Sequence, residues 1–250
     1  MLSKINNRST FSFKCFMLIT VLLSYSSSSF AYLTLSKTRL VVPANEMNAE
    51  IVLSNPSDRT FGYQASVLDG NFSVSDQFAV IPQLGQLDSK QKQELRVMNA
   101  VDTTKFPTDR ESLFYLSIQE IPMLPENAPK SSMMVAINDV IKLLYRPESI
   151  SKHRKNAEKS QLQWTTHGRK MVIENRSPYY FAILNVNING KPVALPKGIS
   201  PRIAKFQPFS KVSFKQVVHK GDKVSVSYLD DYGIKQTTDV SFLQAPLKAK

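Results

Sequence analysis

Apolar and polar side chains alternate in short segments along this chain of 250 residues, and no segment of helical length shows a convincing helical period. The alternation is clear at 49–55, which ends in an Asn-Pro turn signal, at 93–98 and at 224–228. Because successive side chains of a β-strand point to opposite faces, a period of two predicts strands with one buried face. We therefore predict an all-β protein.

The predicted strands fall into two sets. The first set ends with two longer apolar runs, 112–121 and 133–145, which are separated by a loop rich in Pro, Glu and Ser. A polar and strongly charged stretch follows at 148–160, and it marks a candidate domain boundary. The second set comprises the segments 162–164, 170–175, 179–188, 224–228 and 239–243. Two sets of short strands predict two antiparallel, immunoglobulin-like β-sandwiches, at 32–150 and 151–250.

The first 31 residues have a different composition. Three basic residues precede the apolar run 16–23, and a run of small hydroxyl residues leads to Ala31. This order is typical of a secretory signal peptide with cleavage after Ala31, so the mature chain is expected to begin at Tyr32. The alternative is a membrane anchor, but the apolar run is shorter than the ~20 residues that cross a bilayer. No membrane insertion is expected after cleavage.

The mature chain is expected to contain no cysteine and no disulfide, because the single cysteine, Cys15, lies in the predicted signal. A disulfide scaffold, a cysteine nucleophile and a zinc–cysteine site are thereby excluded. Subtracting the three basic residues of the signal from the formal charge of +12 leaves +9 for the mature chain. The basic residues are spread out, and their densest group, 152–155, is expected to be a solvated linker rather than a nucleic-acid or membrane patch.

Enzymatic chemistry is not indicated. The chain has no G-x-S-x-G, no H-E-x-x-H and no glycine-rich phosphate loop, and its three histidines are far apart. Asp230 and Asp231 are adjacent, and adjacent strand residues point to opposite faces, so the pair cannot flank one bond. We expect no enzyme activity, no cofactor and no metal.

Three features exceed what a plain sandwich needs. The run from Met133 is apolar on both faces, which indicates either a central core strand or an edge strand that awaits a partner. Lys142 lies among apolar residues, where it either extends to water or has an anionic partner. Arg39 lies between strand-forming residues, and its simplest explanation is a solvated strand face.

Four motifs resemble the periplasmic chaperones of the bacterial chaperone/usher pathway. The segment 109–116, Asp-Arg-Glu-Ser-Leu-Phe-Tyr-Leu, is continued by Glu-Ile-Pro at 120–122 and resembles a signature of that family. The segments 141–147, 175–180 and 231–233 are similar to its remaining motifs, in the same order. The resemblance covers residues 32–245.

The resemblance implies two immunoglobulin-like domains arranged as a boomerang, with a cleft for a pilus subunit. A subunit of this pathway lacks one strand, and the chaperone lends the last strand of its first domain, a form of β-augmentation called donor-strand complementation. The family's alternating apolar positions match Met133, Val135 and Ile137, which favours the edge-strand alternative. Arg39 and Lys142 match the two cations that bind the subunit's C-terminal carboxylate.

The family also has an inter-domain ionic cluster, which corresponds to Glu111, Arg146 and Asp231. The expected partners are pilus subunits and an outer-membrane usher, and the expected location is the periplasm. The short, cysteine-free loop 123–132 is similar to the short-loop branch of the family. In a regular strand Lys142 faces away from Ile137, although the resemblance implies that both contact the same subunit. A β-bulge, or a cleft that wraps the strand, would reconcile the two positions.

Two other functions compete with this prediction. A pilus subunit or adhesive module would have the same sandwich class, but such subunits typically have a cysteine pair and an N-terminal donor extension, and neither is visible. An exported carbohydrate-active enzyme would need paired acids from different strands, which only a structure could reveal.

Overall fold

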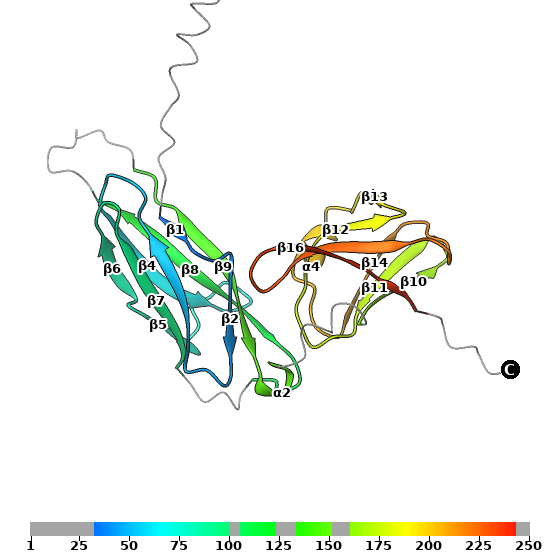
Figure 1. The fold of residues 1–250 in the computed structure, drawn as a ribbon, viewed down its shortest axis with the longest axis horizontal. Coiled ribbons are helices and arrows are strands. Elements are labelled where there is room, and N and C mark those ends of the chain that lie inside the picture. The colour runs from blue at the N-terminus through cyan, green and yellow to red at the C-terminus, as the bar shows by residue number, and fades with distance from the viewer. Residues whose placement is uncertain (1–32, 101–105, 124–133, 152–160, 244–250) are drawn as a thin grey trace, which may run out of the picture. The chain divides into compact units, whose positions relative to one another are not determined.

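The computed structural model describes residues 33–100, 106–123, 134–151 and 161–243. The contacts between residues group the chain from Leu33 on into one unit, whose strands are labelled in Figure 1. The predicted signal, the predicted donor residue Met133 and most of the loop 123–132 lie outside the described residues. All the sheets described below are built from short strands, which confirms the predicted all-β class.

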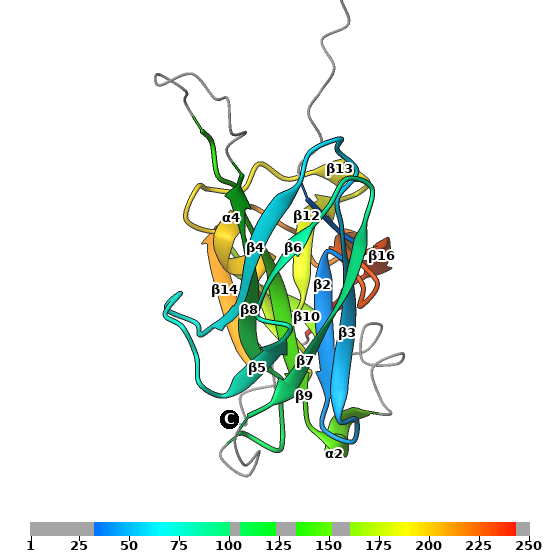
Figure 2. The same cartoon turned by 90° about the vertical axis from the view of Figure 1, so that its left-hand side faces the viewer.

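The first group of strands forms two sheets. Their orders are β1-β3-β7-β5 and β2-β9-β8-β4-β6. The strands are β1 (Thr34–Leu35), β2 (Arg39–Pro43), β3 (Asn48–Ser54), β4 (Phe61–Leu68), β5 (Phe78–Ile81), β6 (Leu84–Leu87), β7 (Lys92–Asn99), β8 (Ser112–Pro122) and β9 (Asn138–Arg146). All pairs are antiparallel except β2 with β9, which run parallel and lie side by side in Figure 2.

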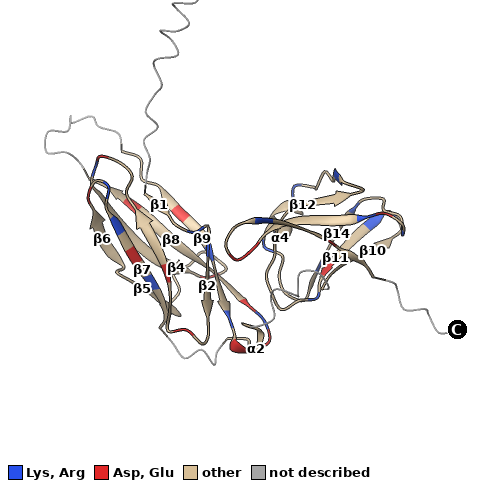
Figure 3. Ribbon diagram, viewed as in Figure 1, with Lys and Arg blue, Asp and Glu red and all other residues tan. Residues whose placement is uncertain are grey.

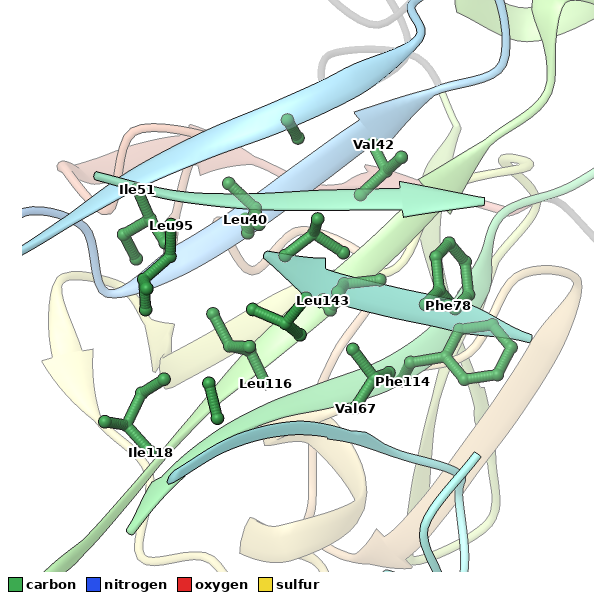
Figure 4. Close-up of a cluster of buried hydrophobic side chains, with 14 of the residues drawn as sticks. Leu40, Val42, Ile51, Val67, Phe78, Leu95, Phe114, Leu116, Ile118 and Leu143 are labelled. Carbon is green, nitrogen blue, oxygen red and sulfur yellow. The ribbon is translucent and has the colours of Figure 1, made fainter. Parts of the chain in front are cut away.

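Alternation along these strands builds the core between the two sheets. Leu95 and Val97 of β7 face inward, as do Leu116 and Ile118 of β8, and all four are buried. Figure 4 shows Leu95, Leu116 and Ile118 in one cluster with labelled side chains of β2, β3 and β9. Burial of such alternating side chains stabilises a sandwich without a disulfide.

The second group of strands also forms two sheets, with the orders β14-β11-β10-β17 and β13-β12-β15-β16. The strands are β10 (Leu162–His167), β11 (Lys170–Asn175), β12 (Ala182–Ile188), β13 (Lys191–Pro192), β14 (Ser210–Lys215), β15 (Val224–Leu229), β16 (Lys235–Asp239) and β17 (Ser241–Phe242). Their core surrounds Trp164, which is 2% exposed. Two short helices, α2 (Glu148–Ser151) and α4 (Ser200–Ala204), were not expected from the sequence.

A buried asparagine organises a loop in each sandwich in the same way. The side-chain amide of Asn55 donates to the carbonyls of Leu87 and Asp88, and its oxygen accepts from Ser57. Asn175 makes equivalent bonds in the second sandwich. This part of the 175–180 motif therefore has a structural role, since an amide buried without partners would be costly.

One strand boundary differs from the sequence prediction, and the domain boundary stays untested. The run 133–145 was expected to be one strand, but β9 begins at Asn138, where its regular pairing with β8 begins. Just before it, the carbonyl of Ile137 still accepts from the amide of Glu120 at 2.8 Å. The predicted domain boundary after residue 150 falls within α2 and stays a prediction.

Candidate functional site

Arg39 and Lys142 are direct neighbours in the parallel pair of β2 and β9. The residues next to them in sequence, Leu40 and Leu143, belong to the buried core of the first sandwich. Because side chains alternate along a strand, Arg39 and Lys142 both project from the opposite face of the sheet. The structure thus brings together two predicted site residues that are far apart in sequence.

Both cations are held by backbone carbonyls of the second sandwich. Arg39 Nη1 donates to the carbonyl of Leu229, at the end of β15, at 3.0 Å. Lys142 Nζ donates to the carbonyl of Ala204, the last residue of α4. Arg39 is only 4% exposed, and Lys142 is half-buried. An ammonium has three N–H donors and a guanidinium has five, so each of these side chains is able to bind more than one acceptor.

The electrostatic surroundings of Lys142 are unfavourable for its charged form. Burial, and then the positive charges of Arg39 and Lys205, lower the pKa of Lys142 to about 8. Burial alone would raise the pKa of Asp230, but hydrogen bonds from Gln236 and from backbone amides, with a smaller contribution from Arg39, lower it. A carboxylate arriving at Lys142 would therefore compensate a charge that is poorly solvated.

The predicted donor residues lie before the start of β9. Val135 is 55% exposed and Ile137 is half-buried, while Met133 lies outside the described residues. Pairing of β8 with β9 is regular from Asn138 to Tyr145, so no bulge occurs there. Ile141 packs against the core, and Lys142 therefore lies on the other face. The structure therefore shows no irregularity in β9 that would turn Lys142 toward the face expected for Ile137.

Among the described residues, one edge of β9 is paired along only part of its length. β2 pairs with β9 from Lys142 to Arg146, whereas the residues from Asn138 to Ile141 pair with β8 on the other side. An edge with unused amide and carbonyl groups can accept a further strand. The exposed Val135 and the half-buried Ile137 lie immediately upstream of this edge.

Glu111, Arg146 and Asp231 lie together. Arg146 Nε donates to Glu111 Oε1 at 2.8 Å, and Arg146 Nη2 lies 2.7 Å from the same oxygen and 2.8 Å from Asp231 Oδ2. Burial alone would lower the pKa of Arg146, but the charges of Glu111 and Asp231 raise it. The other oxygen of Glu111 accepts from the backbone amide of Tyr180 at 2.7 Å. The cluster therefore joins the two sandwiches.

Three residues around these sites were not identified from the sequence. The guanidinium of Arg146 lies over the ring of Tyr179, 5.4 Å from its centroid, and the Tyr179 hydroxyl donates to the carbonyl of Ile150. Tyr180 and Lys205 line a small pocket that also contains Arg39 and Lys142. The tyrosines belong to the 175–180 motif, but the sequence offered no signal for Lys205.

The described residues show neither a metal site nor a membrane span. Within them, no group of three or more His, Cys, Asp or Glu residues could hold a metal ion. None of the helices in the same part of the chain is long and apolar enough to cross a membrane. Lys and Arg are spread over both sandwiches in Figure 3.

Comparison with protein families identifies both sandwiches. Residues 32–151 match the family model described as "Pili and flagellar-assembly chaperone, PapD N-terminal domain", and residues 157–240 match "Pili assembly chaperone PapD, C-terminal domain". The chain belongs to the PapD family of pili-assembly chaperones. The family prediction and the prediction of two immunoglobulin-like domains are confirmed.

Individual members of the PapD family support the same assignment. The chain is 35% identical to chaperone protein FanE of Escherichia coli over 88% of its own length and 94% of FanE. It is 34% identical to chaperone protein FaeE of Escherichia coli, over 86% and 80% of the two chains. The structure of the Salmonella enterica SafA pilin in complex with the SafB chaperone matches with a TM-score of 0.70 and 25% identity, over 86% of this chain and 98% of that one.

Membership of the PapD family decides between the competing functions. The protein is a fimbrial chaperone of the chaperone/usher pathway, and its location is the periplasm. Chaperones of this family are not enzymes, which sets aside an exported carbohydrate-active enzyme. The alternative of a pilus subunit is likewise set aside, since both domain models describe chaperones.

Proposed function

We propose that this fimbrial chaperone binds a pilin subunit along the uncovered edge of β9 and holds the C-terminal carboxylate of the subunit with Arg39 and Lys142. The observation that carries the proposal is the position where β2 begins. β2 occupies the edge of β9 from Lys142 onward, and no strand of the described residues pairs with that edge before Lys142. A subunit strand added to the open part would end where β2 starts.

The positive charges of Arg39 and Lys142 set the direction of the added strand. A strand that runs parallel to β9, as β2 does, has its C-terminal end beside Arg39 and Lys142. An antiparallel strand would place its amino terminus beside two positive charges, which is unfavourable. The two cations therefore select one direction of pairing and fix the register, which matters because a slip by one residue reverses every side chain.

The carboxylate contact and the apolar contacts contribute separately to binding. Charge-assisted hydrogen bonds from Arg39 and Lys142 are worth about 1.5–3 kcal/mol each. Met133, Val135 and Ile137 would fill the groove of the subunit. At roughly 100 Å² each they would bury enough area for about 7 kcal/mol before ordering costs.

Other parts of the proposal concern assembly. Glu111, Arg146 and Asp231 would fix the arrangement of the two domains while a subunit is bound. We also propose export with cleavage after Ala31, domains at 32–150 and 151–250, delivery of the subunit to an outer-membrane usher, and membership of the short-loop branch. Support for the branch comes from the length and composition of the loop 123–132.

Co-expression with a pilin subunit tests the proposal. Lys142→Ala and Arg39→Ala are expected to be folded and soluble, yet to leave the subunit unprotected from periplasmic proteolysis. Lys223→Ala is the matched control, because Lys223 lies beyond the opposite end of β15 from Leu229 and is exposed. Normal pilus assembly with either cleft variant would refute the carboxylate mechanism.

A further inference from the structure

The pocket beside Arg39 and Lys142 contains a third positive charge that the proposed function does not use. Lys205 follows directly after α4, at its C-terminal end. The residues that line the pocket come from β2, β9 and the second sandwich, and none of these lining residues in the described chain is acidic. They are Arg39, Lys142, Leu144, Tyr180, Phe181, Ala182 and Lys205.

A hydrogen bond fixes Lys205 close to Lys142. Lys142 Nζ donates to the carbonyl of Ala204, and Lys205 is the next residue in the chain. The backbone of Lys205 is thereby attached to the site that holds Lys142. Its side chain is exposed, so the ammonium can move toward a ligand that enters the pocket.

The charges around Lys142 favour an anion at this position. Burial, Arg39 and Lys205 all lower the pKa of Lys142, so each of these influences opposes its charged form. Asp230 balances part of the charge of Arg39, which contributes to its own lowered pKa. Three neighbouring cations repel one another in the free protein, and this repulsion is relieved when an anion binds among them.

We propose that Lys205 is a further binding residue for the chain-terminal carboxylate of the subunit, so that the site consists of three cations from two sandwiches. This inference rests on the proposed function, because it assumes that the carboxylate lies beside Arg39 and Lys142. Lys205 would act through its charge from a solvated position, whereas the two more buried cations form directed hydrogen bonds. Its contribution is therefore smaller and more sensitive to salt.

The test uses a peptide that copies the C-terminal strand of a pilin subunit encoded beside the chaperone gene. The peptide is made with a free carboxylate and as the C-terminal amide, and binding is measured by fluorescence anisotropy at low and high salt. The proteins are wild type, Lys205→Gln, Lys205→Arg and Lys223→Gln. Lys223 has an ion pair with Asp239 at 3.4 Å and does not line the pocket, so its variant controls for net charge.

Lys205→Gln is expected to weaken binding of the free-acid peptide by about three- to fivefold at low salt, and less at high salt. Binding of the amide peptide should be unchanged by the same substitution. Lys205→Arg should retain the wild-type affinity, and Lys223→Gln should match wild type with both peptides. Urea unfolding should show that Lys205→Gln is no less stable than wild type, because the side chain is exposed and its charge opposes the charged form of Lys142.

The outcomes separate this inference from the proposed function. If Lys205→Gln weakens both peptides equally, or neither, the inference is wrong while the role of Arg39 and Lys142 stands. If wild type binds the acid and the amide with the same affinity, the proposed carboxylate mechanism itself is wrong. If Lys223→Gln lowers the affinity for the free-acid peptide as much as Lys205→Gln does, the inference is also wrong, because the change in net charge would then explain both losses.

Discussion

Replacing Lys142 with methionine should stabilise the free chaperone near neutral pH while removing its capacity to bind a subunit. The charged form of Lys142 is disfavoured in the folded protein, because burial and the charges of Arg39 and Lys205 lower its pKa from 10.5 to about 8. Methionine has a similar volume, carries no charge and can pack beside Leu144 in the lining of the same pocket.

The size of the effect follows from the two pKa values. The interval between 10.5 and about 8 corresponds to about 3 kcal/mol at most. Lys142 is half-buried, so solvent screening reduces this penalty to about 1–2 kcal/mol. Methionine also loses the hydrogen bond to the Ala204 carbonyl, worth about 1 kcal/mol. Lys142→Met should therefore be more stable than wild type by up to about 1 kcal/mol near neutral pH.

The stability difference between Lys142→Met and wild type should change with pH in a direction that can be measured. Below about pH 8 Lys142 is protonated in both the folded and unfolded states, and the folded state carries the full penalty. Between about 8 and 10.5 the unfolded state binds more protons, so the stability of wild type rises with pH. The advantage of Lys142→Met should shrink over this interval and then reverse, because only the hydrogen-bond loss remains.

Urea unfolding followed by circular dichroism measures this difference at several pH values. Arg39→Met is not a suitable replacement for the test, since Arg39 stays charged throughout the interval. A Lys142→Met variant that is less stable than wild type near neutral pH, with a difference that does not change up to pH 10.5, would refute the reasoning.

Three further predictions concern other parts of the molecule. Glu111→Ala should lower the free energy of unfolding by about 3–5 kcal/mol, because it leaves a buried arginine without its main counter-charge; a loss below about 1 kcal/mol in urea unfolding would contradict this. Val135→Asp should abolish capture of a subunit in a pull-down without changing the unfolding curve, since Val135 is 55% exposed. Gly233→Ala should lower thermal stability more than Gly190→Ala: both glycines have positive φ, of 79° and 78°, but only the new Cβ at 233 would meet another group, the hydroxyl of Thr38. Equal losses for the two glycine variants would show that this contact is harmless.

Some strands were predictable because one face is buried, although β4 and β14, which also have alternating buried residues, were not among the predicted segments. The alternation at 93–98 corresponds to β7, and that at 224–228 to β15, because in each case every second residue enters a core. The start of β9 was not predictable, since the apolar residues before Asn138 continue the pattern without a regular strand pairing. α2 and α4 are too short, at four and five residues, to show a helical period.

The candidate site depends on topology that local sequence does not contain. Arg39 and Lys142 meet only because β2 pairs in parallel with β9. These two strands lie near the two ends of the first sandwich's sequence. Residue types and order pointed to them through a family resemblance rather than through spacing. Lys205 could not be found in this way, because it enters the pocket through the position of α4 against Lys142.

The place where β2 begins has a consequence for when a subunit can bind completely. If a subunit strand binds along the edge of β9 as proposed, it meets the backbone of β2 at Arg39, and a polypeptide that continued past this point would collide with β2. Only a chain that has come to its end can lie there in full. A subunit still emerging from the export machinery would present no such terminus, and complete docking would have to wait until its synthesis and release were finished.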